Sequence, residues 1–414
     1  MAEKTAYSQA VNTGKYDKSS RLLGKYDNVR RCWEDATTAL FLSPFLKGVT
    51  DRKTAAGQKL RVLDLGCGSA DGYELLLSVP SLEENTINNS YVIEPGLLEQ
   101  YVGLDINRDL LDMAEDIYGA LPTHKFVEAD LTHGLPPEIT AEKSFDLYST
   151  TYGTLSHFHD EQNAALIADI AKHAADGSIF VGDWLGRYSY EWQDLWGNPP
   201  DQEYFMDYRI SYIYSEEERK DADIASFPLR LMTRQEILAV IDMAARQSGV
   251  IIEPLSFFDR SILIGRHMDT GDYNANCPKM RVKVNSLIEP HLRTDLSSLK
   301  IDHAPREGFD KLNSFFDYFF SSVNDVMKCA SLLFEGRKSE AEGMARAASE
   351  NKSLAEAMKT MIATADAMSA VNWIDARADF LEPMLGYCLR KLEMELQPGS
   401  GVGHGLVGIF QIRK

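Results

Sequence analysis

Carboxylates and glycines gather in one short segment of this chain, directly after an apolar stretch that has the pattern of a buried strand. Val62 opens that stretch, Asp64 stands near its end, Gly66 and Gly68 form a turn, and a helix is expected to begin near Asp71. The two glycines lack a β-carbon, so the backbone can pass very close to a bound molecule. The free N–H groups of the new helix favour a negative group, and Asp64 adds a fixed negative charge. The turn therefore suits a ligand with both an ammonium and a carboxylate better than a pyrophosphate.

Two more acidic residues end later predicted strands. Asp105 closes the stretch that begins at Tyr101, and Asp130 follows the stretch 124–128. An acidic residue at a strand end can accept hydrogen bonds from both ribose hydroxyls of an adenosine. The separation of Gly66 from Asp105 is larger than in dinucleotide sites, and a polar insertion over 80–100 accounts for the surplus. Because ligands bind at the carboxyl ends of strands in open α/β sheets, these residues predict one nucleoside site.

The segment from Arg61 to Gly72 resembles motif I of the class I S-adenosylmethionine-dependent methyltransferases, which commonly reads Val-Leu-Asp-Leu-Gly-Cys-Gly-x-Gly. Ala70 stands where that pattern has its third glycine. The competing interpretation is the dinucleotide fingerprint, but Asp71 occupies its third glycine position, which argues against NAD. The resemblance covers roughly residues 58–186 and 231–267, and none is found for 271–414.

The resemblance implies S-adenosyl-L-methionine as cofactor. It implies that Asp105 binds the ribose, that Asp130 faces the adenine amino group, that Ile106 and Leu131 cover the ring faces, and that the loop after the fourth strand faces the methionine part. The cofactor-binding residues implied in this way are Asp64, Gly66, Cys67, Gly68, Asp105, Ile106, Asp130, Leu131 and Thr150.

Methyl transfer is an in-line displacement that mainly requires positioning, with a general base where the acceptor carries a proton. His157 is the predicted base, and its alternative role is a helix cap or an exposed side chain. Tyr26 is the second catalytic candidate and is expected to close over the cofactor. Pocket-lining residues are expected after strands four and five, and they are Tyr152, Trp184, Arg187 and Tyr188. The aromatic side chains of 184–214 are expected either to form the wall of the acceptor pocket or to pack between the core and the C-terminal helices. No metal site is expected, because two histidines at the spacing of His157 and His159 are weak support for one.

Strands alternating with helices predict an α/β fold, a Rossmann-like seven-stranded doubly wound sheet with its last strand antiparallel. A helical cap over 1–57 precedes the core domain, 58–270, which includes the aromatic-rich insertion 184–230. Its last two strands are expected at 250–257 and 261–266. Residues 271–414 form a mainly helical accessory domain with a C-terminal strand. Its a/d-type apolar spacing favours a bundle, used for dimerisation or as a lid.

Composition and charge limit the classes of function that the chain can have. The chain has 414 residues and a formal net charge of −19, which opposes binding to nucleic acid phosphates. No apolar run is long enough to span a membrane, and Met1 to Ser8 contain no secretory signal pattern. Five cysteines at wide spacing fit no disulfide framework, so a reducing cytoplasm is expected.

These observations predict an enzyme that transfers a methyl group from S-adenosyl-L-methionine to a small-molecule acceptor. A protein methyltransferase is one alternative. A non-catalytic S-adenosylmethionine-binding or scaffold protein on the same fold is the other, and the acceptor atom stays open, because the same core serves many acceptors.

Overall fold

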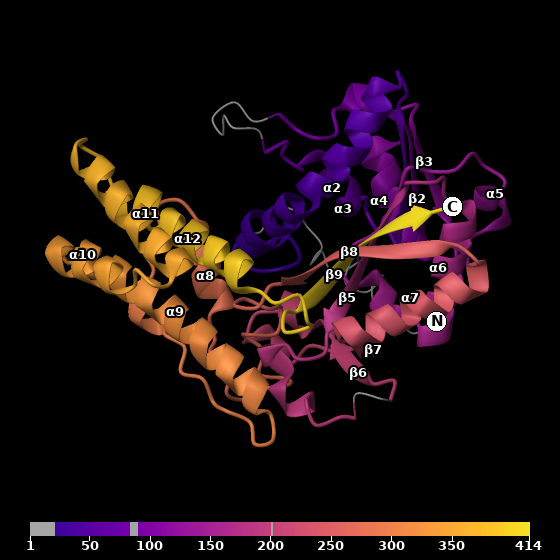
Figure 1. Ribbon diagram of the computed structural model, residues 1–414. Helices are drawn as coiled ribbons and strands as arrows, with labels where there is room; N and C mark the ends of the chain where they lie inside the picture. The colour runs from indigo at the N-terminus through magenta and orange to yellow at the C-terminus, as the bar shows by residue number, and fades with distance from the viewer. Residues whose placement is uncertain (1–20, 83–89, 200–201) are drawn as a thin grey trace.

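A mixed β-sheet forms the centre of the computed structural model, which describes residues 21–82, 90–199 and 202–414 (Figure 1). Within these residues nine strands form one sheet, and its main path runs in the order β3-β2-β1-β4-β5 and continues through β9 to β8. β6 and β7 form an antiparallel hairpin at the end of β5. The strands are β1 (Leu60–Leu65), β2 (Leu98–Asp105), β3 (His124–Glu128), β4 (Leu147–Thr150), β5 (Ile179–Gly186), β6 (Phe205–Arg209), β7 (Ser226–Met232), β8 (Ile251–Arg260) and β9 (Gly405–Arg413).

Helices cover both faces of the sheet and form a separate layer beside it, as Figure 1 shows. Helices of the core and its N-terminal cap are α2 (Ala36–Ala55), α3 (Asp71–Leu77), α4 (Arg108–Tyr118), α5 (Pro137–Thr140), α6 (Asp160–His173) and α7 (Arg234–Ser248). The layer beside the sheet holds α8 (Arg281–Ile288), α9 (Asp310–Phe334), α10 (Lys338–Ala347), α11 (Lys352–Ser369) and α12 (Glu382–Leu396). This arrangement confirms the predicted Rossmann-like fold with an antiparallel last strand. The first twenty residues of the predicted cap lie outside the described residues.

The last strand of the core comes from the end of the chain. β9 pairs antiparallel with β5 on one side, Ile179 opposite Gln411, and with β8 on the other, Ile252 opposite Ile412. The prediction of a strand over Ser261–Arg266 is therefore wrong. That segment is buried but irregular, and β9 occupies the place beside β5 and β8. The helices α8 to α12 are consequently a long insertion between the last two strands of the sheet.

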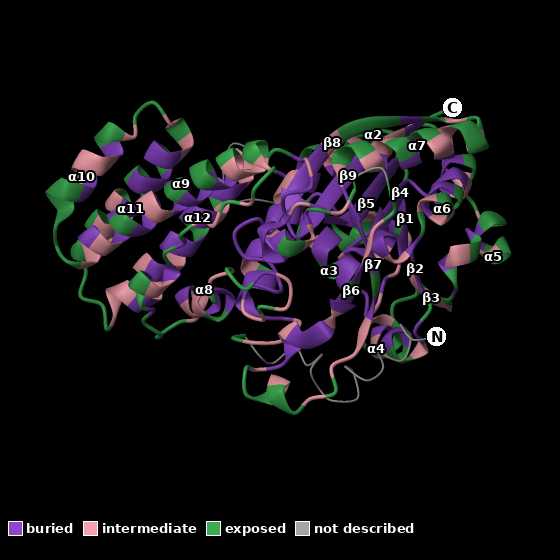
Figure 2. Cartoon of the chain, turned by 90° about the horizontal axis from the view of Figure 1, so that it is seen from below, coloured by how far each residue is buried: buried purple, intermediate pink, exposed green. Residues whose placement is uncertain are grey.

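The N-terminal segment packs against both the helical layer and the sheet, since Leu42 of α2 shares a buried cluster with Val62 of β1 and Tyr101 of β2. Val29 and Trp33 lie in the same buried cluster as Phe316, Val326 and Leu389 of the bundle. The Trp33 indole N–H also donates to a carboxylate oxygen of Glu393, at 3.0 Å. Figure 2 shows the central strands buried and the outward faces of the bundle helices exposed. The N-terminal segment thus joins the bundle to the core.

Ile409→Ala tests the place of β9 in the core. Ile409 is fully buried between β5 and β8, so removing its side chain should lower the free energy of unfolding by about 2–5 kcal/mol. Ile374→Ala removes the same groups from a fully exposed isoleucine. It should change the free energy of unfolding by less than about 0.5 kcal/mol. Urea unfolding of both variants measures the difference. Equal effects would contradict a core position for β9.

Candidate active site

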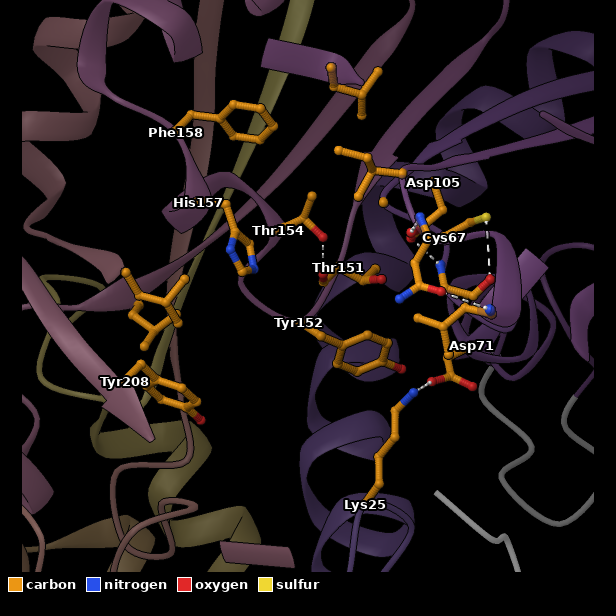
Figure 3. Close-up of a pocket in the computed structure, with 18 of the residues that line it drawn as sticks. Lys25, Cys67, Asp71, Asp105, Thr151, Tyr152, Thr154, His157, Phe158 and Tyr208 are labelled. Atoms are coloured by element: carbon orange, nitrogen blue, oxygen red, sulfur yellow. Dashed lines mark hydrogen bonds and ion pairs between the residues drawn. The ribbon is translucent and has the colours of Figure 1, made fainter. Parts of the chain in front are cut away.

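A pocket lies at the carboxyl edge of the parallel strands, where β1, β2 and β4 end. The structure brings nine of the residues predicted from the sequence to its wall. They are Gly66, Cys67, Gly68, Asp105, Ile106, Asp130, Leu131, Tyr152 and His157. In Figure 3, His157 and Tyr208 lie on one side of the open space, and Cys67, Asp71 and Asp105 lie on the other. The pocket therefore has a glycine-loop end and a histidine–tyrosine end.

The glycine loop is held tightly against β2. The N–H groups of Gly66 and Cys67 both donate to the carbonyl oxygen of Leu104, at 2.7 and 2.9 Å. Gly66 has a φ of +71°, and a β-carbon there would lie 2.4 Å from the Thr154 side chain. A side chain at this position is thus excluded both by backbone conformation and by space. The loop can stay this close to the turn that follows β4 only because residue 66 is glycine.

Asp105 connects the loop to the end of β2. Its two carboxylate oxygens accept from the Gly68 N–H and the Asn107 N–H, each at 2.8 Å. Each oxygen has a second acceptor position, and the residue lines the pocket. Burial raises the pKa of Asp105 above its usual value, and the two backbone N–H groups oppose that rise. The carboxylate is therefore fixed in place with acceptor capacity left for a ligand.

Asp130 stands at the outer rim of the same end. Its Oδ1 accepts from the N–H and the hydroxyl of Thr132, at 2.9 and 2.6 Å. Burial alone would raise its pKa, but the hydrogen bonds from Thr132 outweigh that effect and lower it. Asp130 is ionised at neutral pH and lies beside Leu131, so this rim presents a negative acceptor next to an apolar surface.

Asp64 lies beneath the loop rather than in the pocket wall. Its carboxyl group accepts from the Tyr101 hydroxyl at 2.6 Å and from the Ser149 hydroxyl at 3.3 Å. A β-carbon at Gly72 would lie 2.3 Å from Oδ2, so the start of α3 packs directly on this group. Burial raises its pKa from the ordinary value of 3.8 to about 7. Asp64 therefore supports the loop from below.

Two other predicted residues also act behind the wall. The Thr150 hydroxyl donates to the Val181 carbonyl at 3.3 Å and accepts from the Asp183 N–H at 3.1 Å, so it joins β4 to β5. The Tyr26 hydroxyl donates to Asp71 at 2.9 Å. Neither side chain is part of the main pocket wall, and Tyr26 instead borders a second hollow beside it.

Trp184 does not lie in the pocket wall. β5 continues to Gly186, and successive side chains of a strand point to opposite faces. Leu185 therefore lines the pocket, whereas Trp184 is fully buried and meets Phe410 of β9 edge-on, with ring centroids 6.4 Å apart. Trp184 is a core residue of the sheet.

Arg187 and Tyr188 also lie away from the pocket. The Arg187 Nε donates to Glu236 of α7 at 3.0 Å, and its guanidinium is almost fully buried in that ion pair. Tyr188 packs edge-on against Trp196, with centroids 6.3 Å apart, beside the bundle. Arg187 thus joins β5 to α7 within the core, and Tyr188 contacts the helical layer, so neither side chain reaches the pocket.

The cationic residues of the pocket wall were not predicted from the sequence, whereas Tyr208 and Tyr212 lie in the aromatic segment 184–214 that was expected to form part of it. The wall also contains Lys25, Arg30, Asp71, Thr154, Phe158, Tyr208, Tyr212, Arg260, Arg266 and His404. Asp71, Thr154 and Phe158 lie in or beside segments already singled out in the sequence. Lys25, Arg30, Arg260, Arg266 and His404 come from distant segments, and the topology brings them together.

Each cation of the wall has an acidic partner. The Lys25 ammonium lies 2.8 Å from Asp71, and the Arg30 guanidinium lies 3.5 Å from the same carboxylate. Burial alone would raise the pKa of Asp71, but Lys25 and Arg30 outweigh it and hold that pKa well below its usual range. The glycine-loop end therefore presents ionised groups of both signs. Among the described residues, no group of three or more metal-ligating side chains is present.

Comparison with protein-family models finds no match, and comparison with curated protein sequences finds no relative. Many solved structures are similar over part of the chain. One is an S-adenosylmethionine-dependent methyltransferase from Clostridium acetobutylicum, 13% identical, covering 61% of this chain and 90% of that one, with a TM-score of 0.35.

A second is CalS10, an amino pentose methyltransferase from Micromonospora echinaspora involved in calicheamicin biosynthesis. It is 16% identical, covers 61% of this chain and 91% of its own, and has a TM-score of 0.31. A third is the [4+2]-cyclase SpnF. It is 17% identical, the match covers 52% of this chain and 60% of that one, and the TM-score is 0.31. No helix in the described part of the chain has the length and apolar character needed to cross a membrane.

Asp64→Asn should change how stability depends on pH. The folded protein keeps the Asp64 proton up to a pH of about 7, whereas the unfolded chain loses it near 3.8. The wild-type free energy of unfolding should therefore fall relative to the variant as pH rises through this interval, by up to about 4 kcal/mol. Urea unfolding from pH 4 to 8 measures it, with Asp116→Asn on the exposed side of α4 as control. A pH-independent difference between wild type and Asp64→Asn would contradict the raised pKa.

Proposed function

We propose that this protein transfers a methyl group from S-adenosyl-L-methionine to a small-molecule acceptor. The observation that carries the proposal is one pocket that joins the Gly66–Gly68 loop and the Asp105 carboxylate to a second end, lined by His157 and Tyr208. A cofactor at the first end would point toward an acceptor at the second. This is the arrangement that a direct displacement needs.

The residues of the first end fit the parts of this cofactor. Asp105 has acceptor capacity for ribose hydroxyls, and Ile106 and Leu131 supply apolar surface for an adenine ring next to Asp130. The Lys25 ammonium and the Arg30 guanidinium lie beside Asp71 at the pocket wall, so they offer positive charge to a carboxylate. The carboxylate of an amino acid group would lie near Lys25 and Arg30, and its ammonium would lie near Asp71. The glycine backbone, which has no β-carbon, lets the group approach closely.

The cofactor, when bound, supplies the activated methyl carbon, and the chain supplies position and exclusion of water. Leu185, Leu229 and Phe158 line the pocket and present apolar surface. Tyr208 is almost fully buried, and burial raises its pKa well above the ordinary value, so its hydroxyl stays neutral. These residues favour an acceptor that is partly apolar.

Asp105→Ala should weaken binding of S-adenosylhomocysteine, the demethylated cofactor, by about 1–3 kcal/mol, because charge-assisted hydrogen bonds to the ribose are lost. Isothermal titration calorimetry measures the affinity. Asp116→Ala, an aspartate on the exposed side of the adjacent helix α4, is the control and should bind as the wild type does. Unchanged affinity in Asp105→Ala would remove Asp105 from the site, and no binding to the wild type would refute the proposal.

A labelled-methyl assay should distinguish the acceptor classes. Purified protein, S-adenosylmethionine with a labelled methyl group and a cell extract are incubated, and the products are separated by size. We expect label in the small-molecule fraction. Label in proteins would support a protein methyltransferase instead. Cofactor binding without any transfer would support a binding or scaffold protein.

A cytoplasmic location and a homodimer through the helices α8 to α12 remain predictions. Trp373 and Ile374, between α11 and α12, are exposed in the described structure, and they are the apolar side chains that a second copy could cover.

A further inference from the structure

A histidine and a buried glutamate form a close pair in the pocket wall, outside every motif of the sequence. The Nδ1 of His404 lies 2.5 Å from Oε1 of Glu191, which is 1% exposed. His404 lines the pocket together with Leu185 and Tyr208. A carboxylate on Nδ1 fixes the ring orientation and places the neutral ring's proton on that nitrogen. Nε2 is then left as an acceptor for a proton.

The topology explains why His404 reaches the pocket. β9 runs antiparallel to β5, so the residue just before β9 lies at the same edge as the carboxyl ends of the parallel strands. The backbone of His404 is fixed there, because its carbonyl accepts from the Gly186 N–H and its N–H donates to the Ser261 carbonyl, both at 3.1 Å. His404, just before β9, thus joins the residues that follow β1, β2 and β4 in the wall of the same pocket.

Hydrogen bonds and a glycine fix the carboxylate of Glu191 beside the His404 ring. Its Oε2 accepts from the His267 backbone N–H at 2.7 Å, and its Oε1 accepts from the Ser189 hydroxyl at 3.2 Å. A β-carbon at Gly265 would lie 2.3–2.4 Å from the carboxyl atoms, so only glycine leaves room for the group. Three donors, the histidine included, and a glycine therefore hold one buried carboxylate against His404.

We propose that His404 is the general base of the reaction and that Glu191 is its positioning residue, which implies an acceptor with a hydroxyl group, such as a phenol or an enol. This inference rests on the proposed function. The acceptor oxygen gives its proton to Nε2 of His404 and forms a bond to the methyl carbon. The carbon–sulfur bond breaks with its electron pair left on sulfur, so the products are a methyl ether and a thioether. Glu191 balances the positive charge of the imidazolium.

Other ionisable groups face His404 from each neighbouring element. Burial raises the pKa of Tyr208 on β6 and lowers the pKa of the His267 ring, so both side chains are neutral. Asp183 of β5 and Arg260 of β8 pair with one another at 2.8 Å. Arg266 pairs with Glu34 at 2.8 Å. Glu191 is therefore the carboxylate in direct contact with the His404 ring.

Two other histidines provide comparisons. His157 lies in the same pocket, with its ring 5.4 Å from that of Phe227, and is the rival base. His159 makes the same type of pair as His404, with Nδ1 2.9 Å from Glu203, but it lies on the exposed surface outside the pocket. His159→Gln is thus a matched control that removes a histidine–glutamate pair without touching the site.

Nitrogen-15 NMR of the full-length protein tests the pair without any substrate. In the wild type with S-adenosylhomocysteine, His404 should carry its proton on Nδ1 at high pH, and Nε2 should gain a proton on acidification. In Glu191→Gln, the preference for the Nδ1–H tautomer should weaken while thermal unfolding confirms a folded protein. A proton on Nε2 of neutral His404, or an Nε2 that never titrates, would overturn the proposal.

The pH dependence of methyl transfer tests the role in the reaction. The small-molecule fraction that accepts label serves as substrate. His404→Gln should lower kcat by about 10²–10⁴-fold and remove the rise of rate with pH, while its affinity for S-adenosylhomocysteine stays as in the wild type. His159→Gln should leave the profile unchanged. The proposal is overturned if His157→Gln, and not His404→Gln, removes that rise. Absence of any labelled acceptor would count against the proposed function. The NMR experiment would then still test whether Glu191 holds His404 in the Nδ1–H tautomer.

Discussion

The antiparallel pairing of β9 between β5 and β8 is the constraint on which the rest of the structure depends. Both neighbours would otherwise present open edges in the middle of the sheet. The helices α8 to α12 lie between β8 and β9 in the chain, so the helical layer connects the two strands that complete the sheet. The same strand brings His404 to the carboxyl edge. Fold closure and the composition of the pocket are thus the result of one pairing.

A buried cluster of charges ties the N-terminal segment to this closed core. Glu34 lies 2.8 Å from the guanidinium groups of Arg266 and Arg281 and 3.7 Å from that of Arg260. Burial alone would raise its pKa, but the three arginines outweigh that effect and hold it well below the usual range. Removing one partner of such a cluster leaves uncompensated buried charge, which is costly. Two of these arginines also line the pocket, so the segment that carries Glu34 shapes the pocket's electrostatics.

Local patterns sufficed for part of the site. The turn at Gly66 and Gly68 and the acid at Asp105 follow from short apolar strands that end in special residues, and such signals are contained within a few positions. Trp184 shows where this fails. Its neighbour Leu185 faces the pocket, and only the length and register of β5 decide which of the two does so. His404 and Arg260 could not be found at all, because their approach depends on pairing across more than a hundred residues.

The charges of the pocket follow from that same long-range assembly. The protein has a net charge of −19, yet four cationic side chains, Lys25, Arg30, Arg260 and Arg266, line this one cavity. Lys25 and Arg30 share Asp71, Arg260 pairs with Asp183, and Arg266 pairs with Glu34, so every one of these cations is held in an ion pair. In such surroundings a ligand with both signs of charge leaves no group unpaired, whereas a ligand of one sign must compete with an existing ion pair. This pairing therefore selects for a zwitterion at the glycine-loop end, and the apolar side chains Leu185 and Leu229 select for an uncharged group at the other.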